Sequence, residues 1–448
     1  MSVPDQKKYE RAIVTGSGFA GLLAARVLSD YFRQVVIVEK DDEPNAPLPR
    51  KGAPQGHHIH VLLNAGEQVL ERLFPGIKSE MLEAGSQTAV LGSDVRWRVA
   101  GKWMPPFDGG MTTFFQTRPM LELVLRRRVS NVKNISFKYG TKSTEYRLSE
   151  NDSKITSVTL VDVKTGAESE EEADLFVETS GASTDIIQQL SAMGYPIPRE
   201  SIVEPDFAYS SCLMEVPENW KWRYRCVLIY PKAPEETRAG AFVPVEGRKW
   251  MVTAAGYCGD YPPTTPEEFL EFLKSLPEAD VHETVKSAKI VGEIRSFKFK
   301  KAIRRHFEEL KSFPKGLVVL GDAVCRANPF FGQGITAAAL EALALQKNLE
   351  NISKSGDSIP EAIARPFFKD VAQILDVSWE MAVGEDFKYP TTKGKRPATF
   401  ALTRWFKDKV MASNDPEVAK QFYRVMHFAE PPTKLLTPKM LYRTFLKR

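Results

Sequence analysis

Three glycines near the start of the chain have the spacing of a loop that binds a dinucleotide. Gly16, Gly18 and Gly21 form the pattern GxGxxG, which follows a short apolar run and precedes leucine, alanine and valine residues at helical spacing. In such a loop the first glycine permits a tight turn, the second lets backbone amides approach a pyrophosphate, and the third lets helix and strand pack closely. The start of the helix, at Phe19 and Ala20, would add the positive end of its dipole. The pattern predicts a site for two linked phosphate groups.

An acidic residue closes the next apolar run at the distance that such a unit needs. Residues 35–38 are all valine or isoleucine, and Glu39 follows them, eighteen residues after the last glycine of the loop. A carboxylate at this place accepts hydrogen bonds from a ribose, and Lys40 stands beside it. A GxGxxG pattern alone is weak evidence, but strand, turn, helix, strand and acid all occur here in order. The unit therefore predicts a bound dinucleotide.

A second motif lies three hundred residues further along the chain. The apolar run 317–320 ends in Gly321-Asp322, and a turn then leads to Gly332-Gln333-Gly334 and a strongly helical stretch. An acid at a strand end suits the hydroxyl groups of a ribityl chain. Glycines that open a helix let backbone amides face a ring that takes up electrons. Together the two motifs indicate that the dinucleotide is FAD.

These motifs resemble those of the FAD-dependent monooxygenases of the para-hydroxybenzoate hydroxylase fold, together with Arg118 in Gln-Thr-Arg-Pro. The stretches 54–63, 321–334 and 431–438 are most similar to bacterial polyether epoxidases, which oxidise polyene polyketides. The resemblance covers most of the chain. By this resemblance Gly16, Gly18 and Gly21 would hold the pyrophosphate, Glu39 the adenosine ribose, Arg118 the phosphates or ribityl chain, Asp322 the ribityl side, and Gly332, Gln333 and Gly334 the flavin ring. The further predicted cofactor contacts are Phe19, Ala20, Lys40 and Pro329.

The activity implied by the resemblance is insertion of one oxygen atom from O2 into an apolar substrate. NAD(P)H would reduce the flavin, and a flavin C4a-hydroperoxide would epoxidise a carbon–carbon double bond, or hydroxylate, in a polyene, terpenoid or polyketide. The protein would orient the substrate and exclude water. The chain departs from the family where Ser180 stands at an aspartate position and Ala182 at a common arginine position, in a turn linked to FAD and nicotinamide binding. Direct reduction by NAD(P)H and reduction through a separate flavin reductase therefore both stay open.

Three of the six histidines, His57, His58 and His60, lie within four residues. Side chains two apart point the same way in an extended chain, so we expect His58 and His60 to face the flavin or substrate cleft as candidate catalytic groups. The alternative is that they hydrogen-bond to the backbone of a buried loop. No metal site is expected, because no carboxylate or cysteine stands nearby at a useful spacing.

A β-sheet is predicted between the two cofactor motifs, from alternating patterns at 209–216, 224–230, 241–245 and 250–257. The last two would form a hairpin across Glu246-Gly247-Arg248. Such a sheet would cover the flavin and enclose the substrate. The aromatic residues expected nearest to the substrate are Phe330 and Phe331, followed by Trp97, Trp103, Phe114, Phe115, Trp220 and Trp222.

The expected strands and helices that position these residues, taken in chain order, indicate an α/β fold with an α+β insert. We expect a Rossmann-type FAD-binding domain, an inserted mixed β-sheet substrate domain and a helical C-terminal region. The predicted segments are 1–200 (FAD binding, with small insertions), 201–303 (substrate-binding sheet), 304–355 (return to the FAD domain) and 356–448 (C-terminal helices).

Charge and composition narrow the partners. The 61 lysines and arginines barely outnumber the 57 aspartates and glutamates, so nucleic acid is not an expected partner. Arg126 to Arg128 predict a solvated face or a docking surface on a helix. The basic C-terminal segment, with Leu435, Leu436, Met440, Leu441 and Phe445, would pack on the body or make peripheral membrane contact. Four cysteines without a metal or disulfide pattern, and no signal-type or membrane-spanning run, predict a cytoplasmic protein.

Three alternative functions remain. The first is a flavin-dependent reductase or dehydrogenase of the geranylgeranyl reductase type, which shares the fold and the distal motif. The second is a flavin halogenase, although Trp220-Lys221-Trp222 continues as Arg-Tyr where the halogenase motif has Ile-Pro. The third is a binding protein that keeps the fold without flavin, as the prenyl-Rab-binding dissociation inhibitors do.

Overall fold

A five-stranded parallel sheet carries the first motif. The computed structural model describes residues 9–150, 153–221 and 223–446. The strands of the five-stranded sheet, in the order β19-β11-β1-β2-β7, are runs of apolar residues that are largely buried, as in parallel sheets with both faces covered. Their bounds are β19 Leu317–Val319, β11 Leu175–Glu178, β1 Tyr9–Thr15, β2 Phe32–Val38 and β7 Ile135–Lys138.

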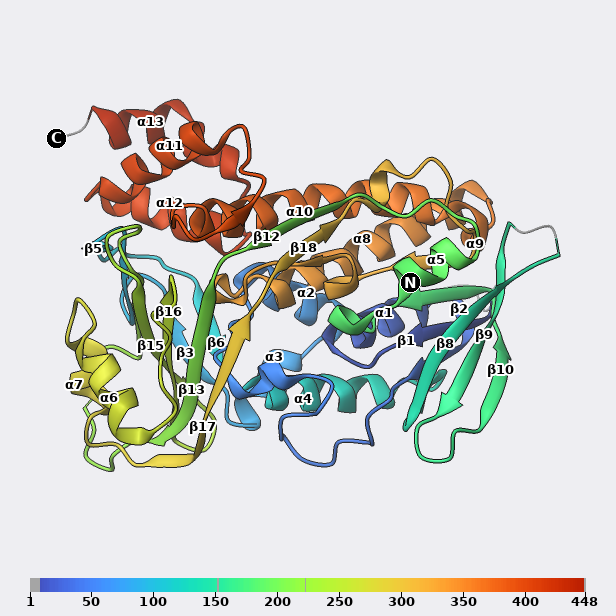
Figure 1. Ribbon diagram of the computed structural model, residues 1–448, viewed down its shortest axis with the longest axis horizontal. Coiled ribbons are helices and arrows are strands. Elements are labelled where there is room, and N and C mark those ends of the chain that lie inside the picture. Colours follow the sequence, from blue (N-terminus) through green and yellow to red (C-terminus); the bar gives the residue numbers. More distant parts are fainter. Residues whose placement is uncertain (1–8, 151–152, 222, 447–448) are drawn as a thin grey trace.

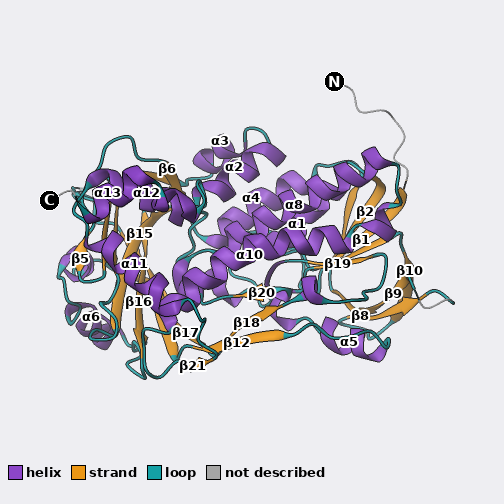
Figure 2. Ribbon diagram, turned by 90° about the horizontal axis from the view of Figure 1, so that it is seen from above, coloured by secondary structure: helices purple, strands orange, loops and turns teal. Residues whose placement is uncertain are grey.

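Four helices pack together beside this sheet. Helix α1 (Phe19–Leu28) contacts α8 (Gly334–Ser355), which in turn contacts α10 (Ala364–Asp386), and Figure 2 shows the three side by side. Helix α4 (Arg118–Ser130) packs against α1 as well. The predicted Rossmann-type unit is confirmed, because α1 connects β1 to its parallel neighbour β2.

A seven-stranded sheet forms the second layer and lies at the left of Figure 1. The predicted hairpin is present, with Val245 opposite Lys249. Two strands from the first segment, β4 and β5, extend this sheet beyond the stretch 201–303, since β4 pairs in parallel with β14. The strands in order are β17 Ile290–Phe299, β13 Phe207–Glu215, β16 Lys249–Tyr257, β15 Arg238–Val245, β14 Cys226–Ile229, β4 Val95–Val99 and β5 Lys102–Trp103.

A four-stranded sheet links the two layers. Strands β12 (Glu200–Glu204) and β18 (Ala302–Arg305) enter and leave the seven-stranded sheet, and β18 pairs with β20 (Cys325–Arg326), which follows the Gly321-Asp322 turn. The four-stranded sheet therefore connects the second cofactor motif to the inserted seven-stranded sheet. The other strands are β3 Gln87–Val90, β6 Thr112–Phe115, β8 Thr141–Leu148, β9 Ile155–Asp162, β10 Glu168–Glu172 and β21 Lys393–Gly394.

Three short helices close the chain at the upper left of Figure 1, above the end of the seven-stranded sheet. They are α11 (Phe400–Ala412), α12 (Pro416–Met426) and α13 (Pro438–Phe445). Helix α12 buries Phe422 and Tyr423 against Trp97 of β4. No helix within the described ranges is long and apolar enough to cross a bilayer. The remaining helices are α2 Asn64–Leu73, α3 Ile77–Glu83, α5 Ile186–Ala192, α6 Pro266–Lys274, α7 Asp280–Val285 and α9 Ile359–Ala362.

Candidate active site

The glycine loop has the geometry that its pattern predicts. A Cβ atom at Gly21 would lie 2.0 Å from the carbonyl oxygen of Gly16, so a side chain there would separate the helix from the strand. Gly16 itself has φ +99°, and a Cβ there would lie 2.7 Å from the carbonyl oxygen of Thr179. A Cβ at Gly18 would meet no atom within 4 Å, and α1 begins there without a side-chain cap. The loop thus leaves open space in front of uncapped helix amides, which fits a phosphate.

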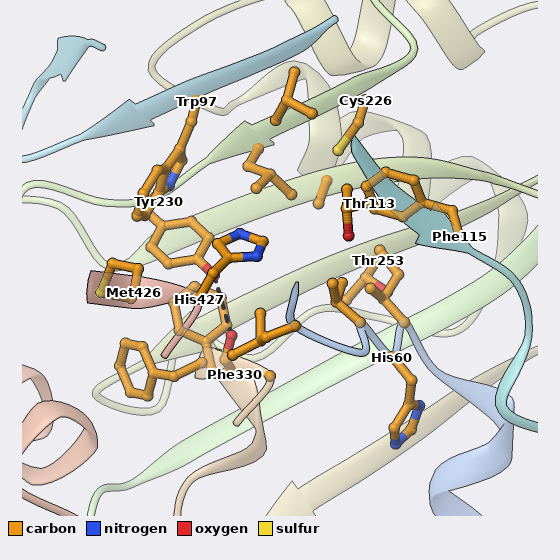
Figure 3. Close-up of a pocket in the computed structure, with 18 of the residues that line it drawn as sticks. His60, Trp97, Thr113, Phe115, Cys226, Tyr230, Thr253, Phe330, Met426 and His427 are labelled. Carbon is orange, nitrogen blue, oxygen red and sulfur yellow. Dashed lines mark hydrogen bonds between the residues drawn. The ribbon is translucent and has the colours of Figure 1, made fainter. Parts of the chain in front are cut away.

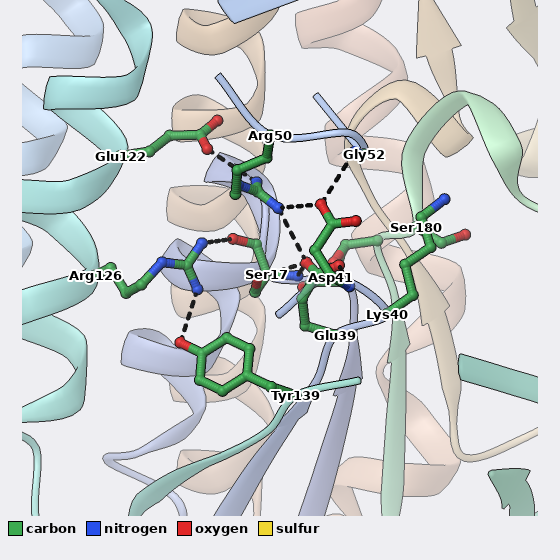
Figure 4. Close-up of polar contacts among 12 residues, drawn as sticks. Ser17, Glu39, Lys40, Asp41, Arg50, Gly52, Glu122, Arg126, Tyr139 and Ser180 are labelled. Carbon is green, nitrogen blue, oxygen red and sulfur yellow. Dashed lines mark hydrogen bonds and ion pairs between the residues drawn. The ribbon is translucent and has the colours of Figure 1, made fainter. Parts of the chain in front are cut away.

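Glu39 stands at the end of β2 and is only 6% exposed. Its Oε2 accepts hydrogen bonds from the Ser17 amide at 2.9 Å and the Ser17 hydroxyl at 2.5 Å, and its Oε1 accepts one from the Asp41 amide at 3.0 Å (Figure 4). Burial raises the pKa of Glu39, but these hydrogen bonds and the charge of Arg50 lower it overall. Glu39 is therefore an ionised acceptor, and Oε1 keeps a free lone pair for a ribose hydroxyl.

Arg50 connects this carboxylate to helix α4. Its guanidinium lies 3.4 Å from Glu39, 3.2 Å from Asp41 and 2.9 Å from Glu122. Glu122 also accepts from Arg118 at 2.8 Å. Burial would raise the pKa of Glu122, but the charges of Arg118 and Arg50 hold it at about 2. No sequence pattern marks Arg50, because it is a single arginine in a loop.

Arg126 holds the glycine loop from its other side. Its side chain donates to the Ser17 carbonyl at 2.8 Å and to the Tyr139 hydroxyl at 3.2 Å, and it is 4% exposed. The prediction of a solvated arginine face is therefore wrong for Arg126. A helix residue turned toward a neighbouring loop can be buried even inside a charged run, since its guanidinium finds carbonyl acceptors there.

The two cofactor motifs meet where the parallel strands end. Gly321 has φ +69°, and a Cβ there would lie 3.0 Å from the Cβ of Ala20. Asp322 lies across from Gly181, with a distance of 3.8 Å between the Asp322 Cβ and the position of a Cβ at Gly181. Lys40 reaches toward the same turn, with its Nζ 3.5 Å from the Ser183 hydroxyl. Residues from three distant stretches thus share one edge of the sheet, as strand ends in such folds do.

The departure at Ser180 has a structural counterpart. The Ser180 amide donates to Glu178 Oε1 at 2.9 Å, and its hydroxyl donates to the same oxygen. Glu178 also accepts from Thr15 at 2.6 Å and from Tyr146 at 3.1 Å. The acid of this turn therefore points into the protein and is engaged by hydroxyl groups, while Ser180 itself carries no charge.

Arg118 lies between the cofactor motifs and the histidines. Its Nη1 donates to His60 Nε2 at 3.4 Å, and the His60 Nδ1–H donates to the His58 carbonyl at 3.0 Å. Burial, then the charge of Arg118, lowers the pKa of His60 to about 4, so the ring is neutral near pH 7. Burial raises the pKa of Asp322, with the charges of Arg118 and Arg326 opposing it. His60 is thus both bonded to the backbone and directed toward Arg118.

The turn before α8 presents its backbone. A single helical turn, Pro329–Phe331, is capped by Asn328, whose side-chain oxygen accepts from the Phe330 amide at 3.1 Å. Gly332 follows with φ +65°, and α8 then begins at Gly334 without a side-chain cap. The side chain of Gln333 is buried, with Nε2 3.6 Å from the sulfur of Met381. This segment can therefore offer uncapped amides to a flavin ring.

A cavity of about 150 Å³ adjoins this turn (Figure 3). Its walls come from the loop 58–63, the seven-stranded sheet, the turn 329–332 and helix α12, and they are mostly apolar. Of the residues expected near the substrate, Phe330, Phe331, Trp97 and Phe115 line the cavity, as do His58 and His60. Phe114, Trp103 and Trp220 do not line it: Phe114 is buried in a core cluster, and Trp103 and Trp220 are partly buried against another. Trp222 lies outside the described residues.

His58 faces the sheet side of this cavity. Its Nδ1 lies 2.9 Å from the Ser211 hydroxyl, which in turn lies 2.7 Å from the Thr253 hydroxyl. The ring packs edge-on against Tyr209 at 4.4 Å between centroids. Burial, with smaller contributions from His60 and His57, lowers the pKa of His58 to about 3. His58 is therefore a neutral ring, able to donate or accept a hydrogen bond but not to carry charge near pH 7.

His427, which the sequence analysis did not select, also lines the cavity. The Asn64 amide donates to its Nδ1 at 3.3 Å, so the proton of the neutral ring sits on Nε2. Burial lowers its pKa to about 4. In Figure 3 the ring is on the same side of the cavity as Tyr230 and Met426, which also line it. No local pattern marks this histidine, because its partner Asn64 is more than three hundred residues away in the chain.

Comparisons with known proteins agree with this geometry. A family model described as an FAD binding domain matches residues 9–358. The protein Rv3254 of Mycobacterium tuberculosis is 29% identical over 430 residues, which cover 93% of this chain and 89% of that protein. The flavin-dependent brominase Bmp2 superposes with a TM-score of 0.65 at 15% identity, covering 94% of this chain and 93% of that one. The p-nitrophenol 4-monooxygenase PnpA of Pseudomonas putida gives 0.63 at 16% identity, with 92% and 97% covered. At these identities the two solved structures show the fold and leave the reaction open.

Proposed function

This chain belongs to the FAD-binding domain family and is an FAD-dependent oxidoreductase, and on this premise we propose that it is a monooxygenase acting on an apolar substrate. The observation that carries the proposal is the apolar cavity beside the turn 329–332. The same turn opens α8 with uncapped amides that suit a flavin ring. A substrate in this cavity would therefore lie against the cofactor and away from bulk water.

In this proposal FAD would span the edge of the five-stranded sheet that the glycine loop, Glu39 and the Gly321-Asp322 turn share. Gly16, Gly18 and Gly21, with the amides of Phe19 and Ala20, hold the pyrophosphate, and Glu39 and Lys40 hold the adenosine ribose. Arg118 and Asp322 lie beside the ribityl chain, where the positive charge of Arg118 offsets phosphate charge. The segment from Pro329 to Gly334 backs the ring. When bound, FAD supplies the activation of O2.

The chain's own residues orient the substrate and keep water out. Phe330, Tyr230 and Trp97 form a continuous aromatic wall, with ring centroids 4.4 Å and 5.5 Å apart in successive pairs. This wall suits an unsaturated hydrocarbon, and we propose epoxidation of a double bond, or hydroxylation, in a polyene, terpenoid or polyketide. The Nε2–H of His427 is a hydrogen-bond donor in this mostly apolar space. It would orient the substrate through an oxygen atom.

NAD(P)H is the proposed electron donor, directly or through a separate reductase. The turn at Ser180 is relevant to this choice, because the family has an aspartate there that is linked to FAD and nicotinamide binding. Here Ser180 contributes no carboxylate, and Glu178 is turned inward. One measurement distinguishes the two routes of flavin reduction. Direct reduction would bleach the flavin absorbance of the isolated protein under anaerobic NADPH, whereas the other route would require an added reductase.

The decisive experiment follows isotopically labelled O2. The purified yellow protein is given a reducing system and a panel of polyenes, terpenoids and aromatics, and products are analysed by mass for one added oxygen. The proposal fails if the donor is consumed and no olefin or aromatic acquires label. Reduction of a substrate double bond without O2 would instead identify a reductase, and a colourless protein that takes up no FAD would identify a binding protein.

The position of Trp220, the first residue of the halogenase-like motif, does not support the halogenase alternative. Trp220 packs edge-on against Trp250, at 5.2 Å between centroids, in the cluster that α6 and α7 cover. It does not line the cavity. A bromide or chloride salt in the assay above tests the point, since a halogenated product would contradict the monooxygenase.

A further inference from the structure

Six large apolar side chains are exposed on the C-terminal helices. They account for six of the eleven large apolar residues that are exposed in the described part of the chain, yet they fall within 45 residues. Their exposed fractions range from 39% to 71%. This group, here named the C-terminal face, comprises Leu402, Trp405, Leu436, Tyr442, Phe445 and Leu446.

The C-terminal face is continuous across two helices. The rings of Trp405 on α11 and Phe445 on α13 are stacked, with centroids 5.6 Å apart. The opposite side of the segment is already used for packing, because Leu435 and Met440 are 8% and 7% exposed and belong to a core cluster. The C-terminal segment therefore packs on the body of the protein with one side and presents a second apolar side outward. Exposed apolar side chains that meet across two helices in this way mark an interaction surface.

The segment that carries this face is strongly basic in sequence. Residues 393–448 contain thirteen lysines and arginines against four acids, whereas the whole chain has a net charge of only +4. Among the acids, Asp415 is paired with Arg443 at 3.0 Å and Asp408 lies 3.6 Å from Arg404. Lys409 and Lys439 are exposed and form no ion pair with described residues. The rest of the chain is therefore net acidic, and the basic charge is concentrated at this end.

We propose that the C-terminal face docks on the surface of an anionic membrane. Exposed apolar side chains in a segment rich in lysine and arginine are what an interfacial helix needs, and Trp405 suits the boundary between headgroups and acyl chains. Anionic lipid complements the charge, with each cation near the surface adding to the attraction. A second copy of the chain is disfavoured as the occupant, because two such basic faces would repel each other.

Helix α12 connects this face to the cavity. It contacts both α11 and α13, and at its C-terminal end Tyr423, Met426 and His427 line the cavity. An apolar substrate dissolved in the bilayer would therefore meet the protein at the end nearest its binding site. This consequence rests on the proposed function, whereas docking itself does not.

The test is co-sedimentation of the FAD-loaded protein with vesicles of phosphatidylcholine, with and without phosphatidylglycerol, in the absence of substrate. We expect binding to the anionic vesicles that weakens with salt and little binding to the neutral ones. An apolar variant, Leu402→Glu with Trp405→Glu, and a charge variant, Lys409→Glu with Lys439→Glu, should each lose about tenfold or more in affinity. The control, Leu48→Glu with Ile197→Glu, changes two equally exposed apolar residues elsewhere and should bind like the wild type.

Every variant must retain FAD and its melting temperature, since all the changed side chains are exposed. The proposal is overturned if the wild-type protein does not bind anionic vesicles at low salt, or if the control variant loses as much affinity as the other two. It is also overturned if the apolar variant instead breaks a dimer seen by sedimentation, or loses capture of an acidic protein while vesicle binding persists. Vesicle binding and oxygen incorporation are separate readouts, so failure of either proposal is recognisable by itself.

Discussion

Gly321 and Ala20, three hundred residues apart in sequence, approach so closely that a Cβ on Gly321 would lie 3.0 Å from the Cβ of Ala20. One residue belongs to the turn that ends β19 and the other to the first turn of α1. The two motifs are therefore packed closely together, with no room for a side chain at Gly321. The left-handed backbone at Gly321, with φ +69°, is what permits this packing.

Replacement of Gly321 by alanine should weaken both the fold and FAD binding. The left-handed conformation alone costs about 1–2 kcal/mol for an alanine, and the contact with Ala20 adds to this. Gly140→Ala is the matched control, because Gly140 has φ +62° but no atom within 4 Å of its Cβ position. Thermal unfolding and flavin titration should show the larger loss for Gly321→Ala. Equal losses in the two variants would mean that the contact with Ala20 contributes nothing.

Glu39→Gln should reduce the affinity for FAD about tenfold or more and leave the affinity for FMN unchanged. The reason is that Glu39 is assigned to the adenosine ribose, which FMN lacks. Asp42→Asn, an exposed acid three residues further on, serves as the control. Calorimetric titration with both flavins measures the difference. A parallel loss for FMN would place Glu39 in general support of the loop through Ser17 instead.

His427→Phe should raise KM for an oxygen-bearing substrate about tenfold, the amount that corresponds to one hydrogen bond, with a smaller change in kcat. A pure hydrocarbon substrate should be nearly unaffected, because it makes no bond with Nε2–H. Met426→Leu, a change on the same cavity wall, controls for altered packing. Steady-state kinetics with both substrates provides the measurement. An equal KM rise for both would show that His427 only shapes the cavity.

Glu341, on α8 beneath the second motif, should make stability fall as pH rises. It is 1% exposed and accepts from the Gly321 amide at 2.6 Å, and burial raises its pKa from 4.5 to about 8, with Asp322 adding to the rise and the hydrogen bond opposing it. Because the folded-state pKa is the higher one, the unfolded chain releases this proton first. The contribution is complete below pH 4.5 and is lost progressively as pH rises to about 8.

Glu341→Gln should therefore flatten the decline of the unfolding free energy between these pH values by about 1 kcal/mol or more. Urea unfolding at several pH values provides the measurement. Glu350→Gln, an exposed position on the same helix, should leave the slope unchanged. A variant slope identical to that of the wild type would show that Glu341 ionises freely in the folded protein.

Much of the fold could be predicted because its signals are local. GxGxxG followed by a helix, a valine-rich strand and Glu39 specifies a βαβ unit through backbone sterics and strand burial. The hairpin around Gly247 was predicted for the same kind of reason, since alternation and turn residues are read within a few positions. The addition of β4 to the sheet could not be predicted, because parallel pairing with β14 joins stretches that share no pattern.

The sequence by itself determined that this protein has an FAD-binding fold, because glycine positions and strand-end acids carry that information in their spacing; the residues that contact the cofactor stay a prediction. The tertiary structure alone decided that Arg50 bridges Glu39 to Glu122, that Arg126 is buried and that His427 lines the cavity. These are contacts between single side chains from distant segments. Such contacts follow from tertiary packing, which the periodicity and spacing of residues in the sequence do not reveal.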